Sequence, residues 1–419
     1  MNILLINQPL NNRGDEAAHK ALVRTLSKDY PDSHIEVLFI DANPDSVEQF
    51  EISATNIEYI NLLPRYDSHS ISYRIYRRFI LDNTMKLLKS RLLQKKSWKC
   101  CVNPKIMLIK KKMKQADIII NSPGGICMGG FQYWPHIALL SIAKSLHKPI
   151  VYYGRSFGPF PTETKDNIIF KEISLDLLNY FKFISIRDSK TEQLADSLGF
   201  EYVKTVDTAF LEVPRVNIPI EIRKSIGDGE YMVFVPNLLI WHYAYRNIPK
   251  QQILKFYLEM IQCIVELYPS LKIVMLPQTF NYKTELMDDI NLFKELSQKT
   301  SSENIIVISD QYSSDIQQTI ISSAKFVVGA RYHSVVFAIN NNVPFVALSY
   351  EHKIAGLLNT LDKTDRMIDI TGLSDVNFDY DSFYLSFKKM IVNLSRDENT
   401  ATRARNIAYD CFCKMLKII

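Results

Sequence analysis

The chain has 419 residues, of which 47% are hydrophobic and 23% are charged, a balance typical of proteins that fold in water. This length suffices for two domains, each with its own core. No apolar run approaches the ~18 residues of a membrane-spanning helix, and the first residues lack the basic and apolar regions of a signal peptide. The six cysteines form no CxxC pair and no metal-ligand spacing, so we expect a reducing cytoplasm and no metal site.

The formal net charge of +5 is unevenly distributed along the chain. Fourteen lysines or arginines and a single acid, Asp82, lie between Tyr73 and Lys114. We expect this segment to be helical, with a loose apolar stripe of Ile75, Phe79, Leu88 and Leu92. The combination favours an anionic membrane surface as partner, whereas a solvated insertion is the alternative. No nucleic-acid-binding motif accompanies the cations, so we expect no nucleic-acid partner.

The first half of the chain alternates between strands and helices, as in a doubly wound α/β domain. Strands are predicted at 2–7, 34–40, 57–63, 116–121, 149–153 and 183–186, and helices at 17–26 and 135–146. The segments 201–204 and 206–210 close this half. The loop between the first strand and helix has neither a GxGxxG nor a GKS/T pattern, which excludes a dinucleotide fingerprint and a P-loop. Its acids, Asp15 and Glu16, are also suited to complementing a helix dipole.

A polar stretch, 214–229, is the expected linker to a second α/β series. Strands are predicted there at 231–235, 271–276, 305–308, 326–328 and 344–348, and helices at 250–267, 284–297, 314–322 and 333–341. We therefore expect two Rossmann-like domains facing a cleft, at 1–215 with a basic insertion at about 73–114, and at 225–377. A helical tail at 378–419 completes an arrangement similar to glycosyltransferase-B folds, in which such a tail often crosses back to the first domain.

Several loops at the carboxyl ends of the predicted strands carry candidate ligand-binding groups. The stretch 122–130 holds four glycines, which allow a close approach between backbone and ligand. Arg155 and Arg187 each follow a predicted strand of the first half. Asp188 and Ser189 are suited to capping the next helix.

The stretch 329–353 concentrates cations at two strand ends of the second half. Arg331 and His333 follow the predicted strand 326–328, and Lys353 follows 344–348. Because ligands of open parallel sheets bind at the carboxyl ends of the strands, these side chains are expected to gather near a helix N-terminus and attract an anion. The alternative is that Arg331 caps a loop and that His333 is a core histidine.

Taken in order, these loops resemble the motifs of the polysaccharide pyruvyl transferase family. The matching segments are Asn12-Arg13-Gly14-Asp15-Glu16-Ala17, Pro123-Gly124-Gly125, Gly154-Arg155-Ser156-Phe157-Gly158-Pro159, Ile186-Arg187-Asp188, Asp207-Thr208-Ala209-Phe210, Gly329-Ala330-Arg331-Tyr332-His333, Val343-Pro344 and Ser349-Tyr350-Glu351-His352-Lys353. One departure is clear. Where family members often carry an arginine after the first strand of the second domain, this chain has Pro236-Asn237, and Arg246 or Arg155 would have to supply that charge.

The resemblance implies transfer of the enolpyruvyl group of phosphoenolpyruvate onto two hydroxyls of one sugar, forming a cyclic ketal and releasing phosphate. It implies His333 as the acid, since the ordinary pKa of an imidazole lies close to the working pH, and Asp15 as the base or sugar anchor. The residues expected to bind the donor anion are Arg331, Lys353, Arg155 and Arg187. Further substrate-lining residues are expected to be Asn12, Gly124, Gly125, Asn237, Gln278 and Glu351.

The implied donor is phosphoenolpyruvate, and no cofactor is called for. The implied acceptor is a sugar on a polyprenyl-pyrophosphate-linked precursor of a surface polysaccharide, which places the enzyme in the cytoplasm at the inner face of the plasma membrane. Two other functions stay open: a glycosyltransferase using a nucleotide sugar, and a catalytically silent protein that binds glycans or lipids. Aromatic side chains near the strand ends, including Phe131 and Trp241, would suit stacking on a sugar, although such residues also build cores.

Overall fold

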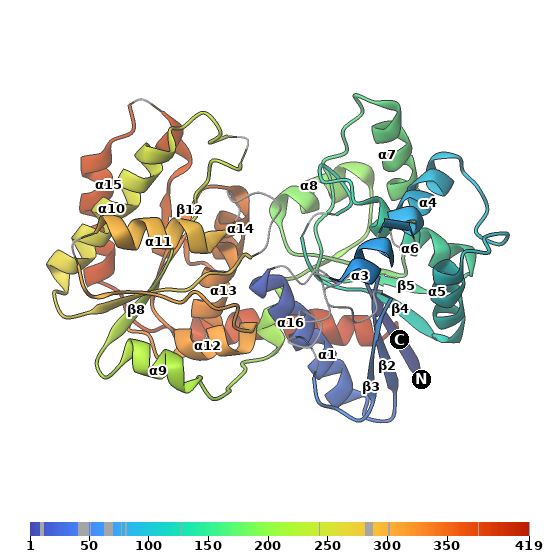
Figure 1. The fold of residues 1–419 in the computed structure, drawn as a ribbon, viewed down its shortest axis with the longest axis horizontal. Coiled ribbons are helices and arrows are strands. Elements are labelled where there is room, and N and C mark those ends of the chain that lie inside the picture. Colours follow the sequence, from blue (N-terminus) through green and yellow to red (C-terminus); the bar gives the residue numbers. More distant parts are fainter. Residues whose placement is uncertain are drawn as a thin grey trace. The chain divides into compact units, whose positions relative to one another are not determined.

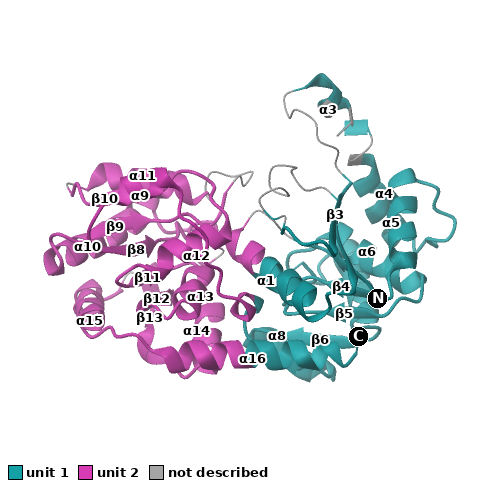
Figure 2. Ribbon diagram, turned by 90° about the horizontal axis from the view of Figure 1, so that it is seen from below, with its two compact units in different colours: residues 1–10, 18–208, 407–419 teal, residues 11–17, 209–406 magenta. Residues whose placement is uncertain are grey.

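The computed structural model describes residues 1–8, 12–40, 50, 52–62, 70–76, 78–79, 82–125, 127–242, 244–280, 288–300, 302–375 and 377–418. Contacts divide the chain into two compact units (Figure 2). Unit 1 comprises Met1–Leu10, Ala18–Thr208 and Ile407–Ile419, and unit 2 comprises Asn11–Ala17 and Ala209–Asn406. Both units are therefore discontinuous in sequence, and the first and last helices are each shared between them.

Unit 1 is built on a parallel sheet of seven strands in the order β3-β2-β1-β4-β5-β6-β7. The strands are β1 (Asn2–Ile6), β2 (His34–Phe39), β3 (Ile57–Asn61), β4 (Ile118–Asn121), β5 (Ile150–Tyr152), β6 (Phe183–Ile186) and β7 (Val203–Lys204). The helices are α1 (Arg13–Asp29), α3 (Ile71–Tyr76), α4 (Asp82–Leu93), α5 (Pro104–Gln115), α6 (Trp134–Ser145), α7 (Lys165–Leu178) and α8 (Ser189–Leu198) (Figure 1).

Unit 2 repeats this plan with six parallel strands in the order β10-β9-β8-β11-β12-β13. The strands are β8 (Tyr231–Val235), β9 (Lys272–Met275), β10 (Ile305–Val307), β11 (Val327–Gly329), β12 (Phe345–Ser349) and β13 (Met367–Asp369). The helices are α9 (Ile220–Ile226), α10 (Lys250–Leu267), α11 (Asp289–Lys299), α12 (Ser314–Ser322), α13 (Tyr332–Asn340), α14 (His352–Thr360), α15 (Tyr380–Val392) and α16 (Glu398–Leu416).

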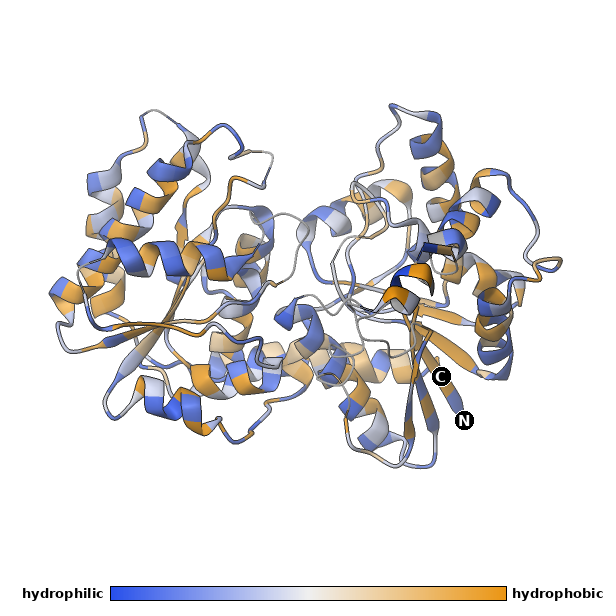
Figure 3. Cartoon of the chain, in the orientation of Figure 1, coloured by the Kyte–Doolittle hydropathy of each residue, from blue (hydrophilic) through white to orange (hydrophobic). Residues whose placement is uncertain are grey.

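The central strands of both sheets are mostly apolar, because helices cover both faces of a doubly wound sheet. Every residue of β4, β8 and β12 is buried, and Figure 3 shows the hydrophobic colouring of the strands. The predicted α/β class with a C-terminal helical tail is thus confirmed, and α15 and α16 form that tail. None of the described helices is long and apolar enough to cross a membrane.

One helix begins earlier than predicted. Helix α1 starts at Arg13 rather than at Ala17, because the Asn12 side-chain oxygen accepts the Gly14 N–H at 2.8 Å and so caps the helix. The motif around Gly14 and Asp15 is therefore the first helical turn and not a loop. The first part of the predicted helix 284–297 lies outside the described residues, which resume at Asp288.

Candidate functional site

Both sheets reverse their strand order next to their first strand, which is where doubly wound sheets open a crevice for ligands. In unit 1 the reversal lies between β1 and β4, and in unit 2 it lies between β8 and β11. The residues that leave β8 and β11 in unit 2 include Asn237, Arg331 and His333. The topology therefore places these three predicted side chains at the ligand-binding edge of one sheet.

Arg331 is the N-cap residue of α13, and its side chain is 12% exposed. Its guanidinium pairs with the Asp289 carboxylate, donates to Thr279 Oγ1 at 2.9 Å, and lies 6.0 Å from the Trp241 ring centre. The same carboxylate accepts the backbone N–H groups of Gln278 and Thr279 at 2.9 and 3.0 Å. Arg331 is thus held in one orientation by a buried, neutralising carboxylate, so it would bind a ligand through directed N–H groups more than through net charge.

His333 is the second residue of α13 and is buried, with Tyr332 edge-on to its ring at 5.0 Å between centroids. Gly14 of α1 lies so close to the imidazole that a Cβ at position 14 would overlap the ring. Asp15 follows directly in the sequence, and no described residue forms a hydrogen bond or ion pair with its carboxylate. The structure therefore packs the imidazole of His333 against the backbone of the residue that precedes Asp15.

The first turn of α1 is fixed in unit 2 by a buried ion pair. Arg13 and Glu16 pair at 2.6 Å, and Arg13 also donates to the Gln311 carbonyl at 2.8 Å. The second oxygen of Glu16 accepts both the backbone N–H and the hydroxyl of Ser314 at 3.0 Å, at the start of α12. A carboxylate at a helix N-terminus also complements the helix dipole. These contacts hold Gly14 and Asp15 beside α13.

Glu351 and Lys353 follow the carboxyl end of the neighbouring strand, β12. Lys353 Nζ lies 3.6 Å from one Glu351 oxygen, and His242 Nε2 lies 4.0 Å from the other. The Tyr245 hydroxyl donates to the Tyr350 carbonyl at 3.0 Å, and burial raises the pKa of the Tyr350 phenol well above its ordinary value. Arg246, a candidate for the missing family arginine, is exposed.

Two buried amides stand at the ends of β8 and β9. The Asn237 side-chain oxygen accepts the Trp241 indole N–H at 2.8 Å. The Gln278 backbone N–H donates to the Asp289 carboxylate, and the Gln278 carbonyl accepts the backbone N–H of Arg13. The side-chain nitrogens of Asn237 and Gln278 are buried and find no acceptor among the described residues. Buried N–H groups without acceptors are rare in folded proteins, so these two donors favour a polar ligand at this edge.

The two predicted cations of unit 1, Arg155 and Arg187, bind groups inside that unit. Arg155 is 1% exposed and donates to the carbonyls of Asn7, Ser122 and Gly125 at 3.0, 2.6 and 3.1 Å. It also donates to Cys127 Sγ at 3.3 Å. Arg155 therefore ties the ends of β1 and β4 to the glycine-rich loop, and its bridge to Gly124 completes that loop.

Arg187 pairs with the fully buried Asp207. Two buried histidines, His19 and His136, lie in the field of Arg155. Burial first and Arg155 second hold their pKa values well below the ordinary range, so both are neutral at pH 7. Of the predicted anion-binding residues, Arg331 and Lys353 lie in unit 2 and Arg155 and Arg187 lie in unit 1.

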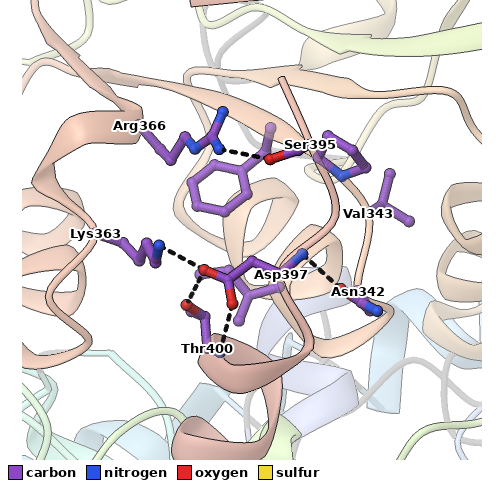
Figure 4. A pocket seen from close by; sticks show the side chains of 10 residues that line it. Asn342, Val343, Lys363, Arg366, Ser395, Asp397 and Thr400 are labelled. Carbon is purple, nitrogen blue, oxygen red and sulfur yellow. Dashed lines mark hydrogen bonds and ion pairs between the residues drawn. The ribbon is translucent and has the colours of Figure 1, made fainter. Parts of the chain in front are cut away.

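Two other features lie away from the sheet edges just described. One shallow pocket at the amino-terminal end of β12 is closed by side-chain pairs, Lys363 with Asp397 at 2.5 Å and Arg366 with Ser395 at 3.2 Å (Figure 4). The Lys363 ammonium lowers the pKa of Asp397 to about 2. His34, Glu36 and Glu58 cluster at the start of β2, where the Lys112 ammonium already binds the two carboxylates. We assign neither feature to catalysis.

Sequence reasoning missed the residues that position the site. Asp289, Thr279, Arg13 and the capping role of Glu16 were not foreseen. Asp289 meets Arg331 across 42 residues of sequence, and only the three-dimensional fold shows that contact. The buried charge of Arg13 and Glu16, three residues apart near a helix start, was the one local signal available.

Comparison with known proteins agrees with this architecture. The model of the family described as polysaccharide pyruvyl transferase matches residues 12–352. The amylovoran biosynthesis protein AmsJ of Erwinia amylovora is 23% identical over 398 residues, covering 90% of this chain and 89% of that protein.

Among solved structures, the UDP-GlcNAc 2-epimerase of Methanocaldococcus jannaschii superposes with a TM-score of 0.54 at 12% identity, covering 100% of this chain and 99% of the other. The UDP-GlcNAc 2-epimerase of Neisseria meningitidis gives a TM-score of 0.52 at 13% identity, over 99% and 100% of the two chains. At such identities the likeness concerns the fold alone. The family match, in contrast, spans most of the sequence and every motif from Asn12 to His352. This chain belongs to the polysaccharide pyruvyl transferase family.

Proposed function

We propose that the protein transfers the enolpyruvyl group of phosphoenolpyruvate onto two hydroxyls of one sugar during polysaccharide synthesis, forming a pyruvate ketal and releasing phosphate. Family membership supports the transfer of a pyruvyl group, and the relation to an amylovoran biosynthesis protein supports a polysaccharide as its destination. The observation that carries the proposal is the meeting of His333 with the first turn of α1. This contact brings the His333 imidazole against the residue that precedes Asp15 in α1.

The reaction needs one acid and one base. Protonation of the donor's C3 carbon turns it into a methyl group and makes C2 electrophilic, and a sugar hydroxyl then attacks C2. Loss of phosphate and attack by the second hydroxyl close the ring. Of the two hydroxyl protons, one is balanced by the proton delivered to C3 and the other leaves with phosphate. We assign His333 as the acid and Asp15 as the base or hydroxyl anchor.

The donor carries a carboxylate and a phosphate, and the unit 2 sheet offers several groups to bind them. Arg331 supplies oriented guanidinium N–H groups, Lys353 a partly exposed ammonium, and α13 the amides of a helix N-terminus. The buried nitrogens of Asn237 and Gln278 suit neutral hydrogen bonds to the same anion. In this arrangement the amide of Asn237 occupies the place of the arginine that relatives often carry after this strand.

The test is to incubate the protein with phosphoenolpyruvate and polyprenyl-pyrophosphate-linked oligosaccharides, measuring phosphate release and product mass. A ketal adds about 70 Da to the oligosaccharide, as the two hydroxyl attacks described above require. The variant His333→Gln should lose about 10²–10⁴-fold in kcat, the usual contribution of a general acid. Its KM for phosphoenolpyruvate should stay within a few fold. The exposed His147 is the matched control, and His147→Gln should keep full activity.

Other products would replace this assignment. Release of a nucleoside diphosphate from a nucleotide sugar would identify a glycosyltransferase. Glycan binding without turnover of either donor would identify a silent member of the family. Normal turnover by His333→Gln, with ketal still formed, would remove His333 from the acid role while leaving the reaction itself in place.

A further inference from the structure

A short apolar stripe with positive charge stands exposed on unit 1. Ile71 and Ile75 lie four residues apart on α3, a spacing that places their side chains on one side of the helix, and Phe79 follows α3 in the sequence. Their exposed fractions are 74%, 54% and 62%. Three large apolar side chains so exposed within 71–79 stand in contrast to the single exposed apolar residues common on protein surfaces.

The cations of this stripe lie among the apolar residues. Arg74 and Arg78 are both exposed, and the Arg78 guanidinium lies 6.0 Å from the centre of the Phe79 ring. No acid occurs in the sequence from Ser70 to Phe79. The stripe therefore presents apolar area and positive charge together, and the sequence 70–79 contains no acidic residue.

Part of the rest of the basic segment is used in contacts inside unit 1. Ion pairs engage Lys89 with Asp166, Lys95 with Glu172 and Lys112 with Glu36. Lys105 and Lys110 donate to backbone carbonyls at 2.7 and 3.0 Å. Among the described residues, the uneven charge of 73–114 thus has a set used in contacts within unit 1 and an exposed set, which comprises Arg74, Arg78, Lys86, Lys96, Lys99, Lys111 and Lys114.

We propose that the α3 stripe, formed by Ile71, Arg74, Ile75, Arg78 and Phe79, docks on the surface of an anionic lipid bilayer. The apolar side chains enter the interfacial region, and the two arginines bind lipid phosphates. A second copy of the chain is disfavoured as the occupant, because it would bring like charges together. An acidic protein is disfavoured because a two-turn helix offers no pocket, whereas a deformable bilayer needs none. This inference does not depend on the identity of the reaction.

The test uses the full-length protein and vesicles of phosphatidylcholine, pure or mixed with phosphatidylglycerol, in a sedimentation assay across a salt series. The wild type should sediment with the anionic vesicles only, and increasing salt should release it. Arg74→Gln with Arg78→Gln should weaken binding about fivefold per charge, the equivalent of about 1 kcal/mol for each cation at an anionic surface. The control pair Lys165→Gln with Lys190→Gln removes two exposed cations elsewhere on unit 1 and should bind almost as the wild type does.

The apolar contribution has its own pair of variants. Ile75→Ser with Phe79→Ser should reduce binding at fixed salt, whereas Leu385→Ser, at an equally exposed apolar residue of unit 2, should not. In Phe79→Trp, lipids brominated in their acyl chains should quench the introduced indole. Equal binding to neutral vesicles, full binding by both α3 double variants, or no quenching would overturn the proposal. A self-association that Ile75→Ser with Phe79→Ser abolishes would instead identify a second copy as the occupant.

Discussion

Because Gly14 has no side chain, the His333 imidazole can lie directly against its backbone. The His333 imidazole occupies the space that a Cβ on Gly14 would need. Glycine is required there for contact and not for backbone conformation, because Gly14 lies within the first turn of α1. The same holds at Gly329, where a Cβ would overlap the Ser334 hydroxyl at the start of α13. Two glycines of the motifs thus position the residues that follow β11.

Replacing Gly14 by alanine should therefore displace the imidazole without unfolding the protein. We expect Gly14→Ala to lower kcat by about 10²-fold, the usual cost of misplacing a reacting group by about 1 Å. Overpacking should reduce the free energy of unfolding by about 1–3 kcal/mol. In the control, Gly372→Ala, the added methyl would come no closer than 3.5 Å to its neighbours, and both quantities should be unchanged. Full activity of Gly14→Ala would show that the position of His333 is not critical.

The buried histidines of unit 1 make stability depend on pH. Groups facing His19 include Arg155, Arg187 and Asp207, and burial with the two arginines keeps its folded-state pKa far below the ordinary 6.5. The unfolded chain takes up protons below pH 6.5 that the folded chain does not. Stability should therefore be fully present above pH 6.5 and fall below it, by up to about 1.4 kcal/mol per pH unit for each buried histidine.

Urea unfolding at several pH values between 7.5 and 5 measures the slope of the free energy of unfolding against pH. His19→Asn and His136→Asn should each flatten it, whatever their effect on stability at pH 7.5. The exposed His147 is again the control, and His147→Gln should keep the wild-type slope. An unchanged slope in both buried-site variants would mean that these histidines are protonated in the folded protein.

At the scale of elements, Glu16 joins helices α1 and α12 through buried hydrogen bonds. Glu16→Ala would leave Arg13 as a buried cation and the start of α12 without its acceptor. Removing one partner of a buried ion pair typically costs about 3–5 kcal/mol. We expect a loss of that order in the free energy of unfolding, measured by denaturant titration. Glu172→Ala, which breaks the exposed pair with Lys95, should cost at most about 1 kcal/mol.

The sequence predicted which elements exist better than it predicted which side chains meet. Apolar runs such as Val343 to Leu348 predicted strands because both faces of a parallel strand are buried. Arg331 and His333 were expected together because they follow one strand. The contacts of Arg331 with Asp289 and of His333 with Gly14 depend on how separate elements pack, and a local pattern carries no such information. The start of α1 was mispredicted because Gly14 has a low helix propensity and Asn12 was not recognised as a cap.

At the scale of the whole molecule, two α/β series were predicted and two parallel sheets are found. The order of the strands, with each first strand next to the fourth, accounts for the candidate groups at the carboxyl edges. Linker signals near residue 214 suggested the boundary between the two domains, and the likeness to glycosyltransferase-B folds suggested a helical tail that crosses back to the first domain. The contacts assign Asn11–Ala17 to unit 2 and Ile407–Ile419 to unit 1, which no local signal indicates.

Because each unit contains a segment from the opposite end of the chain, truncated proteins should behave in an unexpected way. A fragment that begins at Ala209 would lack Arg13 and Glu16, so the start of α12 would lose its buried acceptor. A deletion at the extreme C-terminus would remove Cys411, whose thiol contacts Tyr153 of unit 1. Truncation from either end therefore damages the half of the protein that is distant in sequence. Deletion mapping would therefore attribute functions to the wrong half. In a complementation experiment, the fragment for unit 2 would need Asn11–Ala17, and the fragment for unit 1 would need Ile407–Ile419.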